Sequence, residues 1–296
     1  MMNSESVPEL YLVKAFTKQA TGGNAAGVVL FADKLSKDRK QQIAASLGFS
    51  ETAFVSASAI GDAKVEFFTP NRQIPHCGHA TVATFGLLVE KNLVQEPSAV
   101  KESIEGPRQI DLLSGKVYQS QLAPTYNSLT EVDMLPSEVA SALGLTADYA
   151  FPAEPVVANT GVSFLLVQVP DEETLKALQP LQDKIAAISE KLDLVGFYVF
   201  TTATAQADAT ARMFAPAYGI PEESATGMAA GPLACYLYDF LNFKKQSFLL
   251  HQGYLMQLPS PSQIEVKLQL DAQEHIAGLK AGGHALVVKQ LELAQL

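Results

Sequence analysis

The sequence predicts an α+β fold in which a buried helix is wrapped by sheet, twice over. Three observations support this prediction. Two segments far apart in the chain resemble each other, two helix-like runs are apolar on nearly every side, and strand-like and helix-like runs follow one another in mixed order. The 296 residues are enough for two domains at roughly 150 residues each.

The internal repeat relates residues 67–84, FFTPNRQIPHCGHATVAT, to residues 213–230, MFAPAYGIPEESATGMAA. An offset of 146 positions aligns five identical residues, of which four are Phe, Pro or Ile. The identical pairs are Phe68 and Phe214, Pro70 and Pro216, Ile74 and Ile220, Pro75 and Pro221, and Ala83 and Ala229. Each segment leads from a strand-like run into a helix-like run, so we expect a duplicated unit.

The two central helices are expected at residues 80–89 and 228–240, after alternating strands at 64–68 and 210–214. Both helical runs are apolar on nearly all sides, which is typical of a helix buried within a domain. Gly231-Pro232 should disturb the second helix near its start, where proline costs less than in the middle of a helix.

The remaining elements are shorter. We expect strands at 9–15, 27–31, 53–56, 161–169, 196–201, 263–268 and 284–289, and helices at 38–47, 137–143, 172–177 and 181–192. Their mixed order favours α+β over a doubly wound sheet. A stretch near 124–135 that contains Pro, Asn and Ser predicts a boundary between domains at 1–128 and 129–296, and the last strand could pack with the first domain.

Composition argues against several classes of function. The net charge of −10 disfavours nucleic acid or an anionic membrane as the main partner. No apolar run reaches the roughly 18 residues of a membrane span, and the first ten residues do not resemble a signal peptide. The two cysteines, Cys77 and Cys235, do not make a disulfide framework. We therefore expect a soluble, cytoplasmic protein.

Glu51 is the first candidate for chemistry, in the string Ser50-Glu51-Thr52-Ala53-Phe54. It lies between a helix-like run and an apolar strand, where a carboxyl group facing a cleft would be partly desolvated. Partial desolvation helps a carboxyl group to hold and release a proton near neutral pH, as a general acid or base must. The alternative is a solvated glutamate at a helix end or sheet edge.

The start of the first central helix, Cys77-Gly78-His79-Ala80-Thr81, is the second candidate. Backbone N–H groups at a helix start can hold a carboxylate, and Gly78 lets a ligand approach the backbone closely. His79 could orient the ligand or carry a proton. The alternative is an ordinary turn glycine with a capping residue. His76, Cys77 and His79 lack a further ligand cluster, so we expect no metal.

The start of the second helix, residues 222–228, is the repeat partner of the first. Ser224 or Thr226 would serve as an ordinary N-cap there. If the duplication is real, the two helix starts could hold one anionic substrate between the domains. The glycine-rich residues 21–27 match neither a phosphate loop nor a dinucleotide fingerprint, so we expect no nucleotide cofactor.

Taken together, these strings resemble the PhzF-like (phenazine biosynthesis-like) family, whose fold is that of diaminopimelate epimerase. The matching pieces keep their order over roughly 270 residues. They are Gly23-Asn24 with Val28-Val29-Leu30, Ser50 to Phe54, Phe68-Thr69-Pro70, Pro75 to Thr81, Arg212 to Pro216, Gly219 to Glu222, Ala225-Thr226-Gly227, Gln252-Gly253 with Pro259-Ser260, and Gly282-Gly283.

The resemblance implies two pseudo-symmetric domains, each a curled, barrel-like mixed sheet around a central helix, with the active site between them. It implies a homodimeric isomerase without a cofactor. Glu51 would take a proton from one carbon of a small anionic organic acid and return it to another, assisted by His79 and Glu223. The implied substrate-binding residues are Asn24, Gly78, Ala80, Thr226, Gly227 and Met228.

Four positions depart from the family pattern. Gln73 stands where an acidic residue is usual, Glu223 replaces a shorter Asp, Met228 replaces a Ser, and Leu258 replaces an Arg. These changes predict a substrate other than the phenazine precursor, namely a small, less polar acid.

Two alternatives use the same fold. The changed positions could mark a protein that binds a ligand without turnover. A two-cysteine racemase would use thiols on opposite faces of one carbon, with Cys77 at the first helix start. Cys235 would then be the second thiol, although its place inside the second helix is more typical of core packing.

Overall fold

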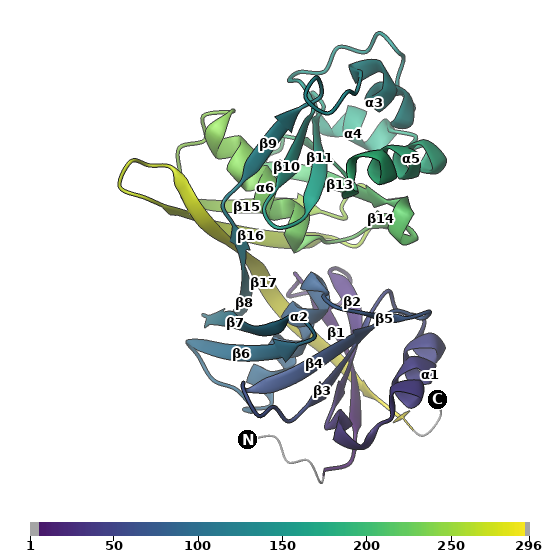
Figure 1. Cartoon of the computed structure of the whole chain (residues 1–296), viewed down its shortest axis with the longest axis vertical. Helices are drawn as coiled ribbons and strands as arrows, with labels where there is room; N and C mark the ends of the chain where they lie inside the picture. The colour runs from purple at the N-terminus through teal and green to yellow at the C-terminus, as the bar shows by residue number, and fades with distance from the viewer. Residues whose placement is uncertain (1–5, 294–296) are drawn as a thin grey trace. The chain divides into compact units, whose positions relative to one another are not determined.

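The computed structural model describes residues 6–293, which form two compact units (Figure 1). Unit 1 contains the chain up to Ser120 together with the C-terminal stretch from Gly282, and unit 2 contains Gln121–Ala281. The last strand, β17 (Ile276–Leu291), therefore begins in unit 2 and ends in unit 1. No helix among the described residues has the length and apolar character needed to cross a bilayer.

Unit 1 is a closed, mixed sheet. Its strands are β1 (Glu9–Ala15), β2 (Asn24–Leu30), β3 (Thr52–Ser56), β4 (Ala63–Phe68), β6 (Ser98–Ser103), β7 (Gly106–Leu113) and β8 (Lys116–Leu122). Each pairs with the next in this order, and β17 pairs with both β8 and β1. Within the described chain these eight strands complete a ring, and a ring has no open edge.

The central helix of unit 1 is α2 (Gly78–Glu90), reached from β4 through the two-residue strand β5 (Gln73–Ile74). Side chains on all sides of α2 are buried, because it contacts β1, β2 and β3, and the polar side chains of His79, Thr81 and Thr84 are buried with the apolar ones. The helix α1 (Lys37–Leu47) begins at Ser36, whose hydroxyl caps the Arg39 N–H, and packs near β4.

Unit 2 repeats this plan. Its strands are β9 (Thr125–Ser128), β10 (Val156–Asn159), β11 (Ser163–Gln168), β12 (Leu194–Thr201), β13 (Ala209–Ala215), β14 (Ile220–Glu223), β15 (Ser247–Gln252) and β16 (Ser262–Leu270). From β10 to β16 the pairs run antiparallel, parallel, antiparallel, parallel and antiparallel, as they do from β1 to β7. The predicted α+β fold of two similar halves is therefore confirmed.

The duplicated segments occupy equivalent places in the two units. β4 folds back on β5 before α2, and β13 folds back on β14 before α6 (Gly227–Asp239). Both central helices span 13 residues and are buried along most of their length. The sequence repeat thus marks the part of each unit that leads a strand into the core helix.

Three further helices of unit 2 pack on its sheet: α3 (Pro136–Ala142), α4 (Glu172–Ala177) and α5 (Gln182–Leu192). Leu175 of α4 and Ile185 of α5 are fully buried against Val167 and Val199 of the sheet. Two short 3-10 turns, η1 (Ala32–Lys34) and η2 (Pro216–Tyr218), complete the described elements.

One expectation about α6 is wrong. Gly231-Pro232 was expected to disturb the helix near its start, but α6 runs without interruption through Pro232. A proline at this position removes one intrahelical N–H donor. Every residue from Ala229 to Tyr238 is buried, so packing against the surrounding sheet stabilises the helix in spite of that loss.

Candidate active site

Glu51 lies directly before β3 and is buried, with 8% of its surface exposed. The helix α1 ends at Gly48, which has a φ of 65°, and this left-handed residue turns the chain toward the sheet. The carbonyl of Glu51 accepts a hydrogen bond from the Gly27 N–H of β2 at 3.3 Å. This backbone contact fixes the position of the chain just before β3, and the Glu51 carboxyl group is held inside unit 1.

The start of α2 is fixed from two directions. The backbone of Cys77 is extended, and its carbonyl accepts hydrogen bonds from the N–H of Thr81 at 3.1 Å and from its hydroxyl at 2.7 Å. The side chain of Gln119 on β8 donates to the carbonyl of Gly78 at 2.8 Å. These bonds set the direction in which Cys77 and His79 leave the backbone.

The structure brings Glu51, His79 and Cys77 together. Glu51 Oε2 and His79 Nε2 lie 3.3 Å apart, and His79 Nδ1 lies 3.6 Å from Cys77 Sγ. His79 and Cys77 are 4% and 7% exposed, so all three groups are shielded from bulk water. Among the described residues no aligned hydrogen bond reaches Glu51 Oε2, which leaves this oxygen available for a proton.

The Cys77 thiol is held in its protonated form. Burial raises the pKa of Cys77, and the nearby Glu51 carboxylate raises it further, while His79 acts in the opposite direction. A thiol in such surroundings is a poor nucleophile and a poor base at neutral pH.

Glu51, Cys77 and His79 are also residue types that bind metal ions, and their ligand atoms gather within 4.8 Å. Cys77 and Glu51, however, approach opposite nitrogens of the same imidazole ring. The lone pairs of these two nitrogens point away from each other, so one ion could not bind all three groups without a rearrangement. The arrangement fits a row of three adjacent polar groups, with the imidazole in the middle, better than a metal site.

Behind the start of α2 lies Lys101 of β6, a fully buried lysine. Its ammonium group donates to Thr81 Oγ1 at 3.2 Å and lies 3.5 Å from His76 Nδ1 and 5.3 Å from the centre of the Phe67 ring. Burial lowers the pKa of Lys101 to about 8. Burial, and then the charges of Lys101 and Arg108, lower the pKa of His76 to about 3, so His76 is neutral at physiological pH.

Gln73, one of the positions that depart from the family pattern, donates from Nε2 to Glu66 Oε1 at 3.4 Å. Glu66 is also paired with Lys40 of α1. An acidic side chain at position 73 would place a second carboxylate against Glu66, so the amide suits this environment better.

In unit 2 the start of α6 is organised by Gln252, which is fully buried. Its Nε2 donates to the carbonyl of Glu223 at 2.7 Å and to Thr226 Oγ1 at 3.1 Å. Its Oε1 accepts from the Thr226 N–H and the Tyr198 hydroxyl, both at 3.0 Å. The Thr226 hydroxyl in turn donates to the Glu223 carboxylate at 2.5 Å. Glu223 and Thr226 are thus held together at the helix start.

The other predicted residues are placed as follows. Asn24 is buried at the first position of β2, and Gly78 and Ala80 lie in the first turn of α2. Gly227 opens α6, and its carbonyl accepts from Gln121 Nε2 at 2.9 Å. Met228 is half-buried in the same turn.

Sequence reasoning missed Lys101, Gln119 and Gln252 as organising residues. For Gln252 a signal existed, because Gln252-Gly253 is one of the strings that carry the family resemblance. Gly253 has a φ of 81°, and a Cβ atom there would lie 2.2 Å from the carbonyl oxygen of Ser260, so only glycine fits this turn.

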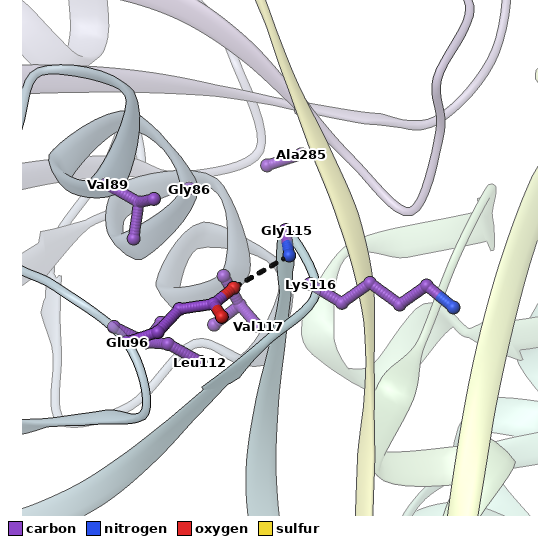
Figure 2. Close-up of a pocket in the computed structure, with 8 residues that line it drawn as sticks. All are labelled: Gly86, Val89, Glu96, Leu112, Gly115, Lys116, Val117 and Ala285. Carbon is purple, nitrogen blue, oxygen red and sulfur yellow. Dashed lines mark hydrogen bonds between the residues drawn. The ribbon is translucent and has the colours of Figure 1, made fainter.

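A cavity of about 40 Å³ lies elsewhere in unit 1, beside Gly86 of α2 and Ala285 of β17 (Figure 2). At its edge the Gly115 N–H donates to Glu96 Oε1 at 2.9 Å. The cavity has room for roughly one or two waters. None of the predicted site residues lines it, and it is too small for an organic acid.

Comparisons with known proteins agree with these features. A model of the phenazine biosynthesis-like protein family matches residues 13–290. The chain is 35% identical over 235 residues to the uncharacterized isomerase YddE of Escherichia coli (strain K12), covering 78% of this chain and 79% of that protein. It is 29% identical over 282 residues to the trans-2,3-dihydro-3-hydroxyanthranilate isomerase of Pseudomonas aeruginosa, covering 92% and 94%.

The fold also matches solved structures. A crystal structure of a PhzF-family phenazine biosynthesis protein from Bacillus anthracis aligns with a TM-score of 0.87, at 24% identity over 97% of this chain and 99% of that one. At this level of identity the similarity supports the architecture.

Proposed function

Because the chain belongs to the phenazine biosynthesis-like protein family and is an isomerase of that family, we propose that Glu51 is the acid/base that moves a proton within a small organic acid. The observation that supports this role is the buried Glu51 Oε2, which lies 3.3 Å from His79 Nε2 and accepts no aligned hydrogen bond from the described residues. A carboxylate in such a position can take up a proton without first breaking a strong contact.

In the proposed step the Glu51 carboxylate takes a proton from a carbon next to a double bond. The electron pair of the broken C–H bond moves into the conjugated system. The Glu51 carboxylic acid then returns the proton to a second carbon, and the carboxylate is regenerated. Nothing is oxidised or reduced, so the step requires no redox partner. His79 stays beside the carboxyl group, where a ring N–H on Nε2 favours the carboxylate form.

The proposed substrate carries a carboxylate. Backbone N–H groups in the first turn of α2, near Gly78 and Ala80, would bind it. Asn24, which belongs to the strings shared with the family, is a further proposed contact. Thr226, Gly227, Met228 and Glu223 at the start of α6 are the corresponding proposed contacts in unit 2. We also propose that the enzyme is a homodimer and needs no cofactor.

Three side chains favour an acid other than the substrate of the Pseudomonas aeruginosa relative. Met228 offers no hydroxyl group, Gln73 offers no charge, and Leu258 is 85% exposed without a polar group. A less polar acid would lose little binding free energy from these replacements, because it makes fewer polar contacts.

The decisive experiment is deuterium incorporation from D₂O into a panel of small amino, hydroxy and aromatic acids that includes trans-2,3-dihydro-3-hydroxyanthranilate. We expect label uptake with the wild type and a loss of at least about 100-fold with Glu51→Gln, because general acid/base catalysis contributes about that much or more. Glu190→Gln is the matched control, since Glu190 is exposed on α5. Unchanged uptake in Glu51→Gln would show that another group moves the proton.

The same panel separates the two alternatives. A protein that only binds ligands would show thermal shifts with some acids and no label in any of them. A two-cysteine mechanism would require Cys235 as well, but Cys235 is fully buried in the interior of α6, and burial raises the pKa of its thiol. Its surroundings fit core packing.

A further inference from the structure

Cys77 is the one member of the buried cluster to which the proposed reaction assigns no step. It lies on the far side of the imidazole from Glu51, with Sγ 3.6 Å from His79 Nδ1. The opposite ring nitrogen, Nε2, lies 3.3 Å from Glu51 Oε2. The imidazole therefore separates a thiol from a carboxyl group, and each ring nitrogen faces one of them.

The two neighbours of the imidazole favour different roles for its nitrogens, because a protonated thiol can donate to Nδ1 and a carboxylate beside Nε2 can only accept. Burial and the Glu51 carboxylate both raise the pKa of Cys77, so the thiol keeps its proton. A protonated thiol can donate only to a ring nitrogen that has a free lone pair. A neutral imidazole has one N–H, and with Nδ1 acting as acceptor that N–H must be on Nε2.

The backbone that carries the thiol is anchored by hydrogen bonds. The carbonyl of Cys77 accepts from the N–H and the hydroxyl of Thr81, and the Thr81 oxygen accepts from the Lys101 ammonium group at 3.2 Å. Both Thr81 and Lys101 are fully buried. The side chain of Cys77 thus projects from a backbone that has little freedom to move.

We propose that Cys77 is a positioning residue whose S–H group fixes the Nε2–H tautomer of His79 and so keeps the ring proton on the nitrogen that lies 3.3 Å from Glu51 Oε2. This inference rests on the proposed role of Glu51 for its functional meaning, but the tautomer can be measured without a substrate. In this arrangement the thiol neither attacks the substrate nor takes its proton.

Three variants test the role by kinetics. Cys77→Ser keeps a donor beside Nδ1 and should retain most of the label uptake from D₂O with an acid that the wild type labels. Cys77→Ala removes the donor and should lower kcat roughly tenfold or more, with KM nearly unchanged. Cys235→Ala is the matched control and should leave kcat unchanged. An equal, large loss in Cys77→Ser and Cys77→Ala would identify the thiol as a reacting group and overturn the proposal.

Nitrogen-15 NMR of protein labelled at its five histidines decides the tautomer directly. The His79 signals are identified by their absence in His79→Gln. At pH 7 we expect a protonated Nε2 and an unprotonated Nδ1 in the wild type and in Cys77→Ser, and loss of this single tautomer in Cys77→Ala. A protonated Nδ1 in the wild type, or an unchanged tautomer in Cys77→Ala, would refute the proposal. If the tautomer is as expected while Glu51→Gln remains active, the proposed function fails and this inference stands.

Discussion

Lys101 places an ammonium group in a fully buried position on β6, behind the start of α2. Burial lowers the pKa of Lys101 to about 8, the Glu105 carboxylate partly opposes that shift, and Arg108 adds to it. Because the group titrates near 10.5 in an unfolded chain, the folded state holds its proton less tightly. The charged lysine is therefore an unfavourable contribution to folding at neutral pH.

The consequence is a stability that rises with pH relative to a variant without the amine. Between pH 8 and 10.5 the unfolded chain binds more protons than the folded one, so deprotonation favours the folded state. We expect the free energy of unfolding of the wild type to gain on the order of 3 kcal/mol over Lys101→Met across this range. Urea denaturation at several pH values measures the difference.

Lys37→Met, at an exposed position in α1, is the control and should show no such gain. Parallel curves for wild type and Lys101→Met would mean that the amine is not buried in a charged form at neutral pH.

Glu51 and His79 could be proposed from the sequence because each lies in a short string with distinctive neighbours, and the structure brings them within 3.3 Å. Lys101 could not. It lies in an ordinary alternating strand, SAVKES, and its burial depends on the closed ring that brings α2 against β6. Long-range packing of this kind leaves no local pattern to recognise.

At the scale of elements, the start of α6 depends on one side chain from another strand. Thr226, the N-cap, makes no side-chain capping bond within its own helix. Its N–H is instead bound by Gln252 at the end of β15, and the same amide group also bonds Glu223 and Tyr198. The helix start that carries the proposed contacts of unit 2 is therefore attached to the sheet by Gln252.

Replacing Gln252 with Leu should lower the free energy of unfolding by about 3 kcal/mol, since several buried polar groups lose their partner at about 1–3 kcal/mol each. Hydrogen exchange of the Thr226 amide should become faster, because its acceptor is removed. Gln263→Leu, an exposed position on β16, should change stability by less than about 0.5 kcal/mol. A slow Thr226 amide in Gln252→Leu would show that the helix start is held by other contacts.

Elements in which apolar residues recur at regular spacing were predictable from the sequence. The expected helices at 38–47 and 172–177 correspond closely to α1 and α4, and the strand at 9–15 is β1. β7 and β9 were not predicted, because much of each strand is exposed and polar. Such strands are defined by the neighbours with which they pair, which the local sequence does not reveal.

At the scale of the whole molecule, the end of the chain completes the unit with which it began. β17 pairs with β1 from Leu291 back to Ala285, and Ala285 lies against Gly86 of α2 (Figure 2). A Cβ atom at Gly86 would lie 2.3 Å from the Cβ of Ala285. The contact is too close for two alanines, so glycine at 86 allows the strand to approach the helix.

A double-mutant cycle tests this contact. Gly86→Ala should lower the free energy of unfolding by about 1–3 kcal/mol through overpacking. Ala285→Gly should cost less, and the double variant should regain most of the loss of Gly86→Ala, giving a coupling energy of about 1 kcal/mol or more. Strictly additive effects would mean that the last strand does not pack on α2 as described.

The return of β17 also constrains how the protein is made. Unit 2 is continuous in sequence, whereas the ring of unit 1 lacks one strand until residues 282–291 have left the ribosome. During synthesis the nascent first half therefore exposes the edges of β1 and β8, and such unpaired edges invite association with other chains. Of the two halves, the one translated first is therefore the one whose sheet is completed last.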